Sequence, residues 1–420
     1  MAEQEFVQKV FAQYYAENAA KIMPPSSIAQ REFGVLIFRE KMMVRHKALN
    51  TPEELRGFVI SMSPSDVYYS SAYYEHPEEP MGRKGWLGAD LIFDIDSDHI
   101  QTPCKSRHDY WVCESCSNTG IGVKPSACPK CGGTKFKTEG WLCESCLNAA
   151  KAETQKLLDF LSSDFGFRPE NLVTCFSGQR GYHVHIEEPD IRFLDQNSRK
   201  EIVDYITGTG IKVEFQGLFE TRDSRSRLTV RPDLNGLGWQ GRMMRGVYDL
   251  LAAAPTWASD ELGLPKGTTK LIQENRELIL ESLAGKSQWM PVKGLSPRTL
   301  AKLAERGIAS QASAVDTVVT TDIHRLIRLP ETLHGKTGLR AMEIPSQSLD
   351  RFDPLSDAVA FKKGTLEVFV QDSYSFRIGE QTFGQYHEEK VELPIAAAMY
   401  LVCKKVAAPT AQILPHFKTS

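Results

Sequence analysis

The sequence predicts a mixed α/β (α+β) protein in which a β-sheet core flanked by helices is interrupted by a metal-binding module and a small helical insertion domain. Three observations support this prediction. Short apolar strands and amphipathic helices occur at both ends of the 420-residue chain. Seven of the nine cysteines lie between positions 104 and 146. From 232 to 313 the sequence is typical of helices separated by Gly and Pro.

These observations divide the chain into three parts. We expect a discontinuous core at 1–231 and 314–420, a cysteine-rich module at 104–146, and a helical subdomain at 232–313. The net charge of -3 excludes a surface that is basic throughout, so a polyanion would need a local patch. We find neither a membrane-length apolar run nor a signal-peptide pattern, and therefore expect a cytoplasmic protein without a membrane partner.

The predicted elements of the first half of the chain follow from apolar periodicity. Residues 5–21 predict an amphipathic helix, and 32–38 and 89–96 predict strands. Leucines and alanines at helical spacing predict a helix over 147–166 that ends at a glycine. Residues 171–188 predict a strand, a tight glycine-containing turn and a second strand.

The second half begins with helices and returns to strands. Residues 268–285 predict one helix, and 290–307 predict a helical hairpin. Strands are expected at 366–371 and 374–378, and a helix at 394–407. This order favours one catalytic core that is interrupted by the helical insertion.

Two carboxylates interrupt the apolar strand "DLIFDID". Side chains two apart on a strand share a face, so Asp94 and Asp96 project side by side. Burial and mutual repulsion make that arrangement costly unless a divalent cation such as Mg²⁺ or Mn²⁺ binds both. The alternative is a solvated strand end at which the two residues only cap a turn.

Two further stretches carry groups that suit phosphate. In "SGQRGYHVHI", a glycine turn holds Ser177 and Arg180 and leads into His183, although an ordinary hairpin would look similar. The stretch 320–340 gathers acidic and basic side chains around "HGKTG". This is not a Walker motif, because Pro330 stands where that motif requires Gly.

Taken together, "KGWLGADLIFDIDSDH", "CFSGQRGYHVHI" and "DIHRLIRLPETLHGKTGL" resemble the catalytic small subunit of archaeal and eukaryotic DNA primases, and most closely the archaeal members. The resemblance implies a primase-type core. It implies that Asp94, Asp96 and Asp322 bind the catalytic divalent metals. It also implies a set of nucleotide-binding residues, namely Ser177, Arg180, His183, Arg328, His334 and Lys336.

The resemblance implies an enzyme that synthesises short primers on single-stranded DNA from NTPs by two-metal nucleotidyl transfer, and it leaves open whether dNTPs are substrates as well. It also implies a heterodimer with a large subunit that carries an iron–sulfur cluster. Two alternatives stay open on the sequence alone. One is a polymerase of end-joining repair from the same superfamily, and the other is a zinc-ribbon scaffold that binds nucleic acid without catalysis.

The cysteine-rich module offers eight ligands, which is enough for two tetrahedral Zn²⁺ sites with no position left for water. Members of the family carry one such site, whereas "WVCESC" and "WLCESC" repeat here 30 residues apart, as if a second zinc ribbon were inserted. A nested pairing joins Cys104, His108, Cys143 and Cys146 around an inner set of Cys113, Cys116, Cys128 and Cys131. A sequential pairing is equally compatible with the spacing, but the nested one would clamp the following helix to the acidic strand.

Arginines near the start of the helical segment form a candidate nucleic-acid-binding surface. Its arginines are Arg222, Arg225, Arg227, Arg231, Arg242 and Arg245. Such a stripe could follow a DNA backbone, or its members could form internal salt bridges with Glu220, Asp223 and Asp233.

Overall fold

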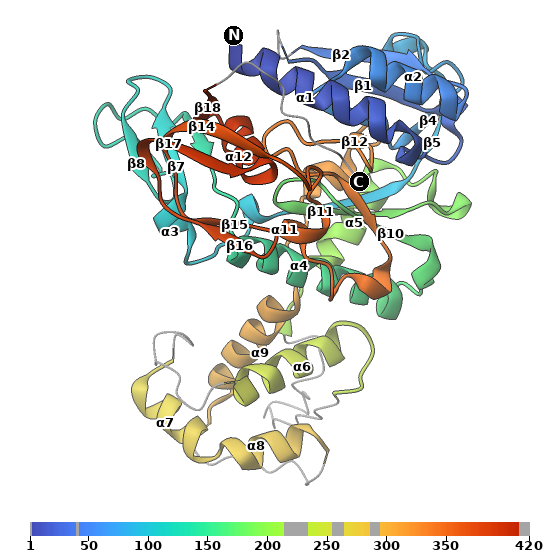
Figure 1. Ribbon diagram of the computed structural model, residues 1–420. Coiled ribbons are helices and arrows are strands. Elements are labelled where there is room, and N and C mark those ends of the chain that lie inside the picture. Colours follow the sequence, from blue (N-terminus) through green and yellow to red (C-terminus); the bar gives the residue numbers. More distant parts are fainter. Residues whose placement is uncertain (1, 39–41, 214–233, 254–263, 286–294, 411–420) are drawn as a thin grey trace. The chain divides into compact units, whose positions relative to one another are not determined.

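Two units make up the chain in this computed structural model (Figure 1). The structure describes residues 2–38, 42–213, 234–253, 264–285 and 295–410. The first unit comprises 1–155, 168–200 and 315–420, and the second comprises 156–167 and 201–314. The second unit therefore takes in more of the chain than 232–313, and how the functional domains divide stays a prediction.

The mixed α/β class is confirmed by the elements of the described residues. The helices are α1 (Ala2–Asn18), α2 (Pro52–Met62), α3 (Lys105–His108), α4 (Glu144–Asp159), α5 (Gln196–Ile206), α6 (Gly238–Ala253), α7 (Lys266–Glu274), α8 (Arg276–Leu283), α9 (Pro297–Gln311), α10 (Thr317–Thr321), α11 (Pro354–Asp357) and α12 (Ile395–Cys403).

The strands are β1 (Glu32–Leu36), β2 (Met43–Ala48), β3 (Asp66–Ser70), β4 (Ala72–Tyr74), β5 (Trp86–Ala89), β6 (Leu91–Asp96), β7 (Tyr110–Cys113), β8 (Thr119–Ile121), β9 (Phe136–Glu139), β10 (Leu172–Phe176), β11 (Gly181–Ile186), β12 (Leu326–Arg328), β13 (Met342–Ile344), β14 (Thr365–Asp372), β15 (Phe376–Ile378), β16 (Gln381–Phe383), β17 (His387–Pro394) and β18 (Ala407–Pro409).

One sheet of the first unit carries the acidic strand. Its strand order is β13–β10–β11–β6, and all neighbouring strands are antiparallel. The predicted strand–turn–strand is therefore present as β10 and β11. The register pairs Asp94 with His183 and Asp96 with Gly181, so the glycine turn lies beside the second aspartate. The apolar side chains of β6 are buried on both faces, which fixes the strand in place.

A buried ion pair supports the start of β6. The guanidinium of Arg31 lies 2.7 Å from a carboxylate oxygen of Asp90, and neither side chain is exposed. The hydroxyl of Tyr73 donates to the same carboxylate at 2.7 Å. Arg199 donates to the Asp90 carbonyl at 2.8 Å. Because each buried polar group has a partner, the residue just before the acidic strand is held from three directions.

A second sheet of the same unit has the order β12–β3–β1–β2. It brings the late part of the chain beside the early part, because β12 pairs with β3 and places Arg328 opposite Tyr68. Helix α10 comes shortly before β12 in sequence, and it packs against the acidic strand β6. The backbone N–H of Asp316, just before α10, donates to the Asp94 carbonyl at 2.9 Å.

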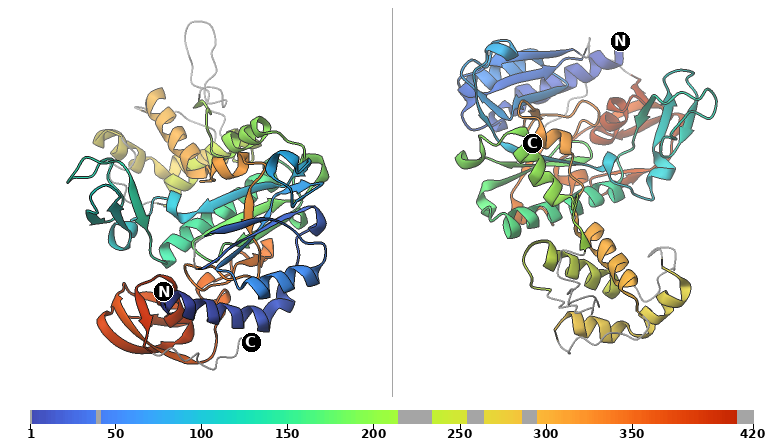
Figure 2. Two further views of the ribbon diagram at one scale, coloured as in Figure 1. Left: turned by 90° about the horizontal axis from the view of Figure 1, so that it is seen from above. Right: turned by 180° about the vertical axis from the view of Figure 1, so that it is seen from behind.

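The cysteine-rich module contains a small three-stranded sheet of order β8–β7–β9, which extends from the rest of the first unit (Figures 1 and 2). One face is covered by Trp111, whose ring packs edge-on against Phe136 at 5.3 Å between centroids. A Cβ at Gly120 would overlap the Trp111 ring, so glycine is required there. The module thus has a small apolar core of its own.

The C-terminal part of the first unit holds the apolar helix α12 against the sheet β17–β14–β18. Exposed and buried residues alternate along β14, as expected for a strand with one face covered. Nearly all side chains of α12 are buried. This packing fixes the position at which α12 ends, immediately before Lys404.

The second unit is helical in its described residues, and α6 packs on α9 (Figure 1). The prediction of one helix over 268–285 is wrong. The structure has α7 and α8, with a break at Asn275, whose φ and ψ of -108° and 12° leave the helical region. The first half of the predicted hairpin at 290–307 lies largely outside the described residues, and α9 forms the second half.

Arg242 of the basic stripe is buried in the second unit and does not present its charge to solvent. Its guanidinium donates to Asp164 at 2.8 and 2.9 Å and to Asp159 at 2.7 Å, and it stacks on Phe160 at 3.6 Å from the ring centroid. Arg242 is therefore paired internally, as in the alternative interpretation, but its partners are Asp159 and Asp164 and not the acidic residues named from the sequence. Arg222, Arg225, Arg227 and Arg231 lie outside the described residues.

The predicted helix over 147–166 begins three residues early, at Glu144, and continues as a π-helical turn over Phe160–Asp164. Gly166 follows with a positive φ of 76°. Helices often end at a residue in this left-handed conformation, and that residue is usually glycine. In the described parts of the chain, no helix is both long and apolar enough to cross a bilayer.

Candidate active site and metal-ligand clusters

The two aspartates of β6 lie in different electrostatic surroundings. Nδ1 of His183 lies 2.8 Å from a carboxylate oxygen of Asp94. Burial raises the pKa of Asp94, but His183 more than compensates and the pKa ends below its ordinary value. The pKa of Asp96 is raised, chiefly by burial and further by Asp94, although Arg180 acts in the opposite direction. A cation beside Asp96 would relieve this unfavourable burial of charge.

The predicted third aspartate is connected to the acidic strand through α10. Asp322 follows the last residue of α10, and Asp316, which precedes α10, is hydrogen-bonded to the Asp94 carbonyl. The helix between these two aspartates packs against β6. Asp322 is therefore brought into the neighbourhood of β6 from more than 200 positions further along the chain.

The three aspartates do not form a tight single-ion cluster. Among the described residues, only the two cysteine-containing sets place three or more ligand atoms within 4.8 Å of one another. A two-metal site is wider, because its ions lie 3.5–4 Å apart and each ligand needs to reach only one of them.

The glycine turn between β10 and β11 is stabilised by hydrogen bonds within the turn and by contacts with the "HGKTG" loop (334–338), called the late loop below. Ser177 Oγ accepts hydrogen bonds from the backbone N–H groups of Gln179 and Gly181 at 3.3 and 3.2 Å. Gly178 has a φ of +81°, and a Cβ there would lie 2.9 Å from the Cβ of His334. Thr337 Oγ1 donates to the Gly178 carbonyl at 2.5 Å. The turn and the "HGKTG" loop therefore form one structure.

Arg180 points inward from the glycine turn rather than into solvent. It is 3% exposed and pairs with Asp98, while its Nη1 lies 3.7 Å from Asp109. Its Nε and Nη1 have no hydrogen-bond partner among the described residues. Burial lowers the pKa of the guanidinium, which nevertheless stays charged at neutral pH. A buried cation with unused donors is suited to bind an anion.

The late loop is fixed by one carboxylate that sequence analysis missed. Asp66, on β3, accepts from Arg328 at 2.5 Å, from the Ser65 hydroxyl at 2.7 Å and from the Gly335 N–H at 3.1 Å. His334 is buried, and burial followed by Arg328 holds its pKa well below the ordinary value of 6.5, so it is neutral. Lys336 is exposed at the tip of the loop.

We expect the Asp66 carboxylate to make the free energy of unfolding depend on pH in the acidic range. Burial would raise its pKa, but Arg328 and hydrogen bonds from Ser65 and Gly335 hold it at about 2, below the value of 3.8 taken for the unfolded chain. Its contribution is thus complete above pH 4 and is lost as the pH falls towards 2, amounting to about 2 kcal/mol. Urea unfolding between pH 5 and pH 2.5 should show a flatter pH dependence for Asp66→Asn than for wild type.

The exposed Asp190 supplies a matched control for that experiment. Asp190→Asn should keep the wild-type slope of unfolding free energy against pH. An Asp66→Asn slope equal to wild type would show that Asp66 is not held below its ordinary pKa.

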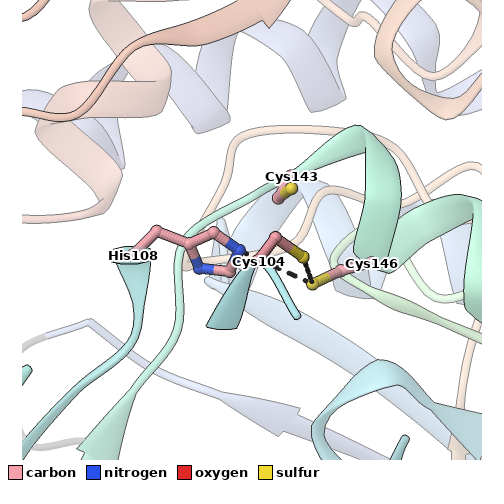
Figure 3. Close-up of side chains that lie close together, drawn as sticks. All are labelled: Cys104, His108, Cys143 and Cys146. Atoms are coloured by element: carbon pink, nitrogen blue, oxygen red, sulfur yellow. Dashed lines mark hydrogen bonds between the residues drawn. The ribbon is translucent and has the colours of Figure 1, made fainter. Parts of the chain in front are cut away.

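The outer set of predicted zinc ligands comes together in the structure. The ligand atoms of Cys104, His108, Cys143 and Cys146 lie within 4.8 Å of one another (Figure 3). Cys146 Sγ lies 3.5 Å from Cys104 Sγ and 3.7 Å from Nε2 of His108. This is a complete donor set for tetrahedral Zn²⁺. It joins α3 to the start of α4, as the nested pairing requires.

The inner set is equally close. The Sγ atoms of Cys113, Cys116, Cys128 and Cys131 lie within 4.8 Å of one another, with Cys113 to Cys131 at 3.6 Å and Cys116 to Cys128 at 3.7 Å. Four thiolates at this spacing suit a structural Zn²⁺. The geometry therefore selects the nested pairing over the sequential one.

One hydrogen bond and one ion pair join the outer cysteine set to the glycine turn. Nδ1 of His108, on the side of the ring opposite the cysteines, lies 2.7 Å from Asp109, and Asp109 lies 3.7 Å from Arg180. A carboxylate in this position commonly orients a metal-bound histidine. Sequence analysis missed Asp109 and Asp66, because neither belongs to a motif and their arginine partners, Arg180 and Arg328, are distant in sequence.

Comparisons with known proteins agree with this geometry. The sequence model of the family described as "DNA primase small subunit" matches residues 138–345. The chain is 35% identical to the DNA primase small subunit PriS of Cenarchaeum symbiosum, over 95% of this chain and 96% of that protein. It is 31% identical to PriS of Nitrosopumilus maritimus, over 96% and 98% of the two chains. Its identity to PriS of Methanococcoides burtonii is 33%, over 96% and 97%.

The fold and the site define a mixed α/β protein with an acidic strand, a glycine turn and a cysteine-rich module. The chain belongs to the DNA primase small subunit family. The resemblance stated on the sequence motifs is thereby confirmed, as is the prediction of an enzyme of the primase class.

Proposed function

We propose that this chain catalyses template-directed synthesis of primers on single-stranded DNA by nucleotidyl transfer from nucleoside triphosphates. The observation that carries the proposal is the pairing of β6 with β11, which sets Asp94 opposite His183 and Asp96 beside the glycine turn. The α10 segment adds Asp322 to the same region. The proposed metal ligands would thus lie next to groups that could donate to phosphate.

Asp94, Asp96 and Asp322 would hold two Mg²⁺ or Mn²⁺ ions, because hard carboxylate oxygens are the ligands that these ions prefer. When bound, the ions would lower the pKa of the attacking 3′-hydroxyl and neutralise charge on the departing pyrophosphate. The raised pKa of Asp96 is consistent with a residue that awaits a cation. Without a bound ion, His183 pairs with the Asp94 carboxylate.

The basic groups of the site would bind and orient the triphosphate. Arg180 offers two unused guanidinium nitrogens, and Lys336 offers an exposed ammonium group. Ser177 keeps the turn in shape through its two backbone hydrogen bonds, and Arg328 fixes the late loop through Asp66. The neutral His334 would contribute as a hydrogen-bond donor.

The remaining cofactor and partner proposals follow from the ligand sets and from the family. Each cysteine-containing set would hold one structural Zn²⁺. The relatives are named as small subunits, so we propose a heterodimer with a large primase subunit, which would take part in initiation.

One experiment separates primer synthesis from the alternatives. The purified chain, alone and with the large subunit, is incubated with circular single-stranded DNA and either NTPs or dNTPs, in the presence of Mg²⁺ or Mn²⁺. We expect short products that begin de novo. Products only from an annealed end would favour a repair polymerase, and no product under any condition, despite DNA binding, would favour a scaffold.

A further inference from the structure

The end of α12 places a lysine beside the glycine turn. Lys404 follows the last residue of the helix, and its Nζ donates to the Gly140 carbonyl at 2.6 Å. Tyr400, one turn earlier, accepts a hydrogen bond from the Leu142 N–H at 3.1 Å, and its ring packs edge-on against Trp141 at 5.5 Å. The backbone of 140–142 and the helix end are therefore fixed against each other.

Arg180 shares this location. A Cβ at Gly140 would overlap the Arg180 guanidinium, which therefore lies directly against the residue that Lys404 contacts. The absence of a side chain at Gly140 leaves room for the guanidinium. Two cationic groups from distant parts of the chain thus meet at one glycine.

The tip of the late loop lies at the same place. A Cβ at Gly338 would lie 3.6 Å from the Sγ of Cys403, the residue before Lys404. On its other side the loop is bonded to the glycine turn, through Thr337 and the Gly178 carbonyl. Lys336 therefore belongs to a loop that is held between the end of α12 and the turn that carries Arg180.

The positive charges of Lys336 and Lys404 are not neutralised by ion pairs with carboxylates of the described residues. Burial, together with Arg180 and Lys336, lowers the pKa of Lys404 to about 8, although Glu139 and Asp109 act in the opposite direction. A bound polyanion would relieve the repulsion between these cations.

We propose that Lys404 is a further phosphate-binding residue, which acts with Arg180 and Lys336 on the terminal phosphates of the incoming nucleotide. The inference rests on the proposed nucleotidyl-transfer function and adds to it a contribution from the C-terminal helix. Lys404 would distinguish a triphosphate from a monophosphate, because the proposed contact is with the terminal phosphates, which a monophosphate lacks.

Lys404→Gln removes the charge and keeps a side chain of similar length. We expect its affinity for ATP, measured by calorimetry without template, to fall about tenfold, which corresponds to the loss of one charge-assisted hydrogen bond. Binding of AMP should stay unchanged. In primer extension, KM for ATP should rise about tenfold at nearly constant kcat, and Lys404→Arg should restore most of the affinity.

Lys390→Gln is the matched control, because Lys390 is exposed on β17 in the same C-terminal region. Circular dichroism and thermal unfolding check the fold, and Lys404→Met, which keeps the aliphatic stem, replaces the Gln variant if that one is unfolded. Equal loss of ATP and AMP affinity, or no loss, would overturn the inference. A wild-type chain that binds no ATP would instead overturn the proposed function.

Discussion

Asp94→Asn should reduce nucleotide incorporation by about a thousandfold, which corresponds to several kcal/mol of lost transition-state stabilisation. The substitution keeps the size of the side chain and an oxygen that can accept from His183, which lies 2.8 Å away. It removes the negative charge that we propose to hold a divalent cation. The measurement is primer extension on a DNA template at saturating metal and nucleotide.

The same variant should stay folded and keep its affinity for single-stranded DNA, because Asp94 packs as before among the buried residues of β6. Asp190→Asn removes an identical charge from an exposed site and should incorporate nucleotide at the wild-type rate. If Asp94→Asn retained more than about a tenth of the activity, the metal role of the acidic strand would have to be abandoned.

Removal of the outer zinc site should damage the whole first unit, whereas removal of the inner site should not. Cys146 is fully buried and lies between Cys104 and His108, at the point where α3 meets α4. Because metal binding contributes directly to folding free energy, Cys146→Ser should lower the midpoint of thermal unfolding by on the order of 10 °C. The path through Asp109 should also loosen Arg180 and lower nucleotide affinity.

Cys128→Ser is the corresponding change in the inner set, where the ligands contact one another and the small sheet around them. It should lose one zinc per chain but keep most of its unfolding temperature and nucleotide incorporation. Metal analysis should find two zinc ions in wild type and one in each variant. Fewer than two in wild type, or equal damage from both variants, would contradict the two-site proposal.

Local patterns were sufficient to predict much of the core. The D-x-D strand and the glycine hairpin depend on contacts between neighbours in sequence, and both are present as β6 and as β10–β11. Repeats of cysteine spacing gave the eight candidate zinc ligands, but not their pairing. Spacing is the same in both pairings, so only the folded path of the chain distinguishes them.

What could not be predicted depends on tertiary contacts. Asp66 is separated from Arg328 by 262 positions, and no periodicity links the two. Lys404 meets Gly140 across 264 positions. The break at Asn275 was missed for a local reason. The apolar pattern continues across this residue and helix propensity changes little there, so only its non-helical dihedral angles separate α7 from α8.

The position of β6 at the end of its sheet has a consequence for solubility. A last strand leaves a row of backbone groups without a neighbouring strand, and such a border invites another molecule to add a strand of its own. Here the Asp316 N–H occupies the Asp94 carbonyl, and α10 covers that border. The short helix that precedes Asp322 therefore also blocks strand addition at this point of the border, and we expect this to limit self-association.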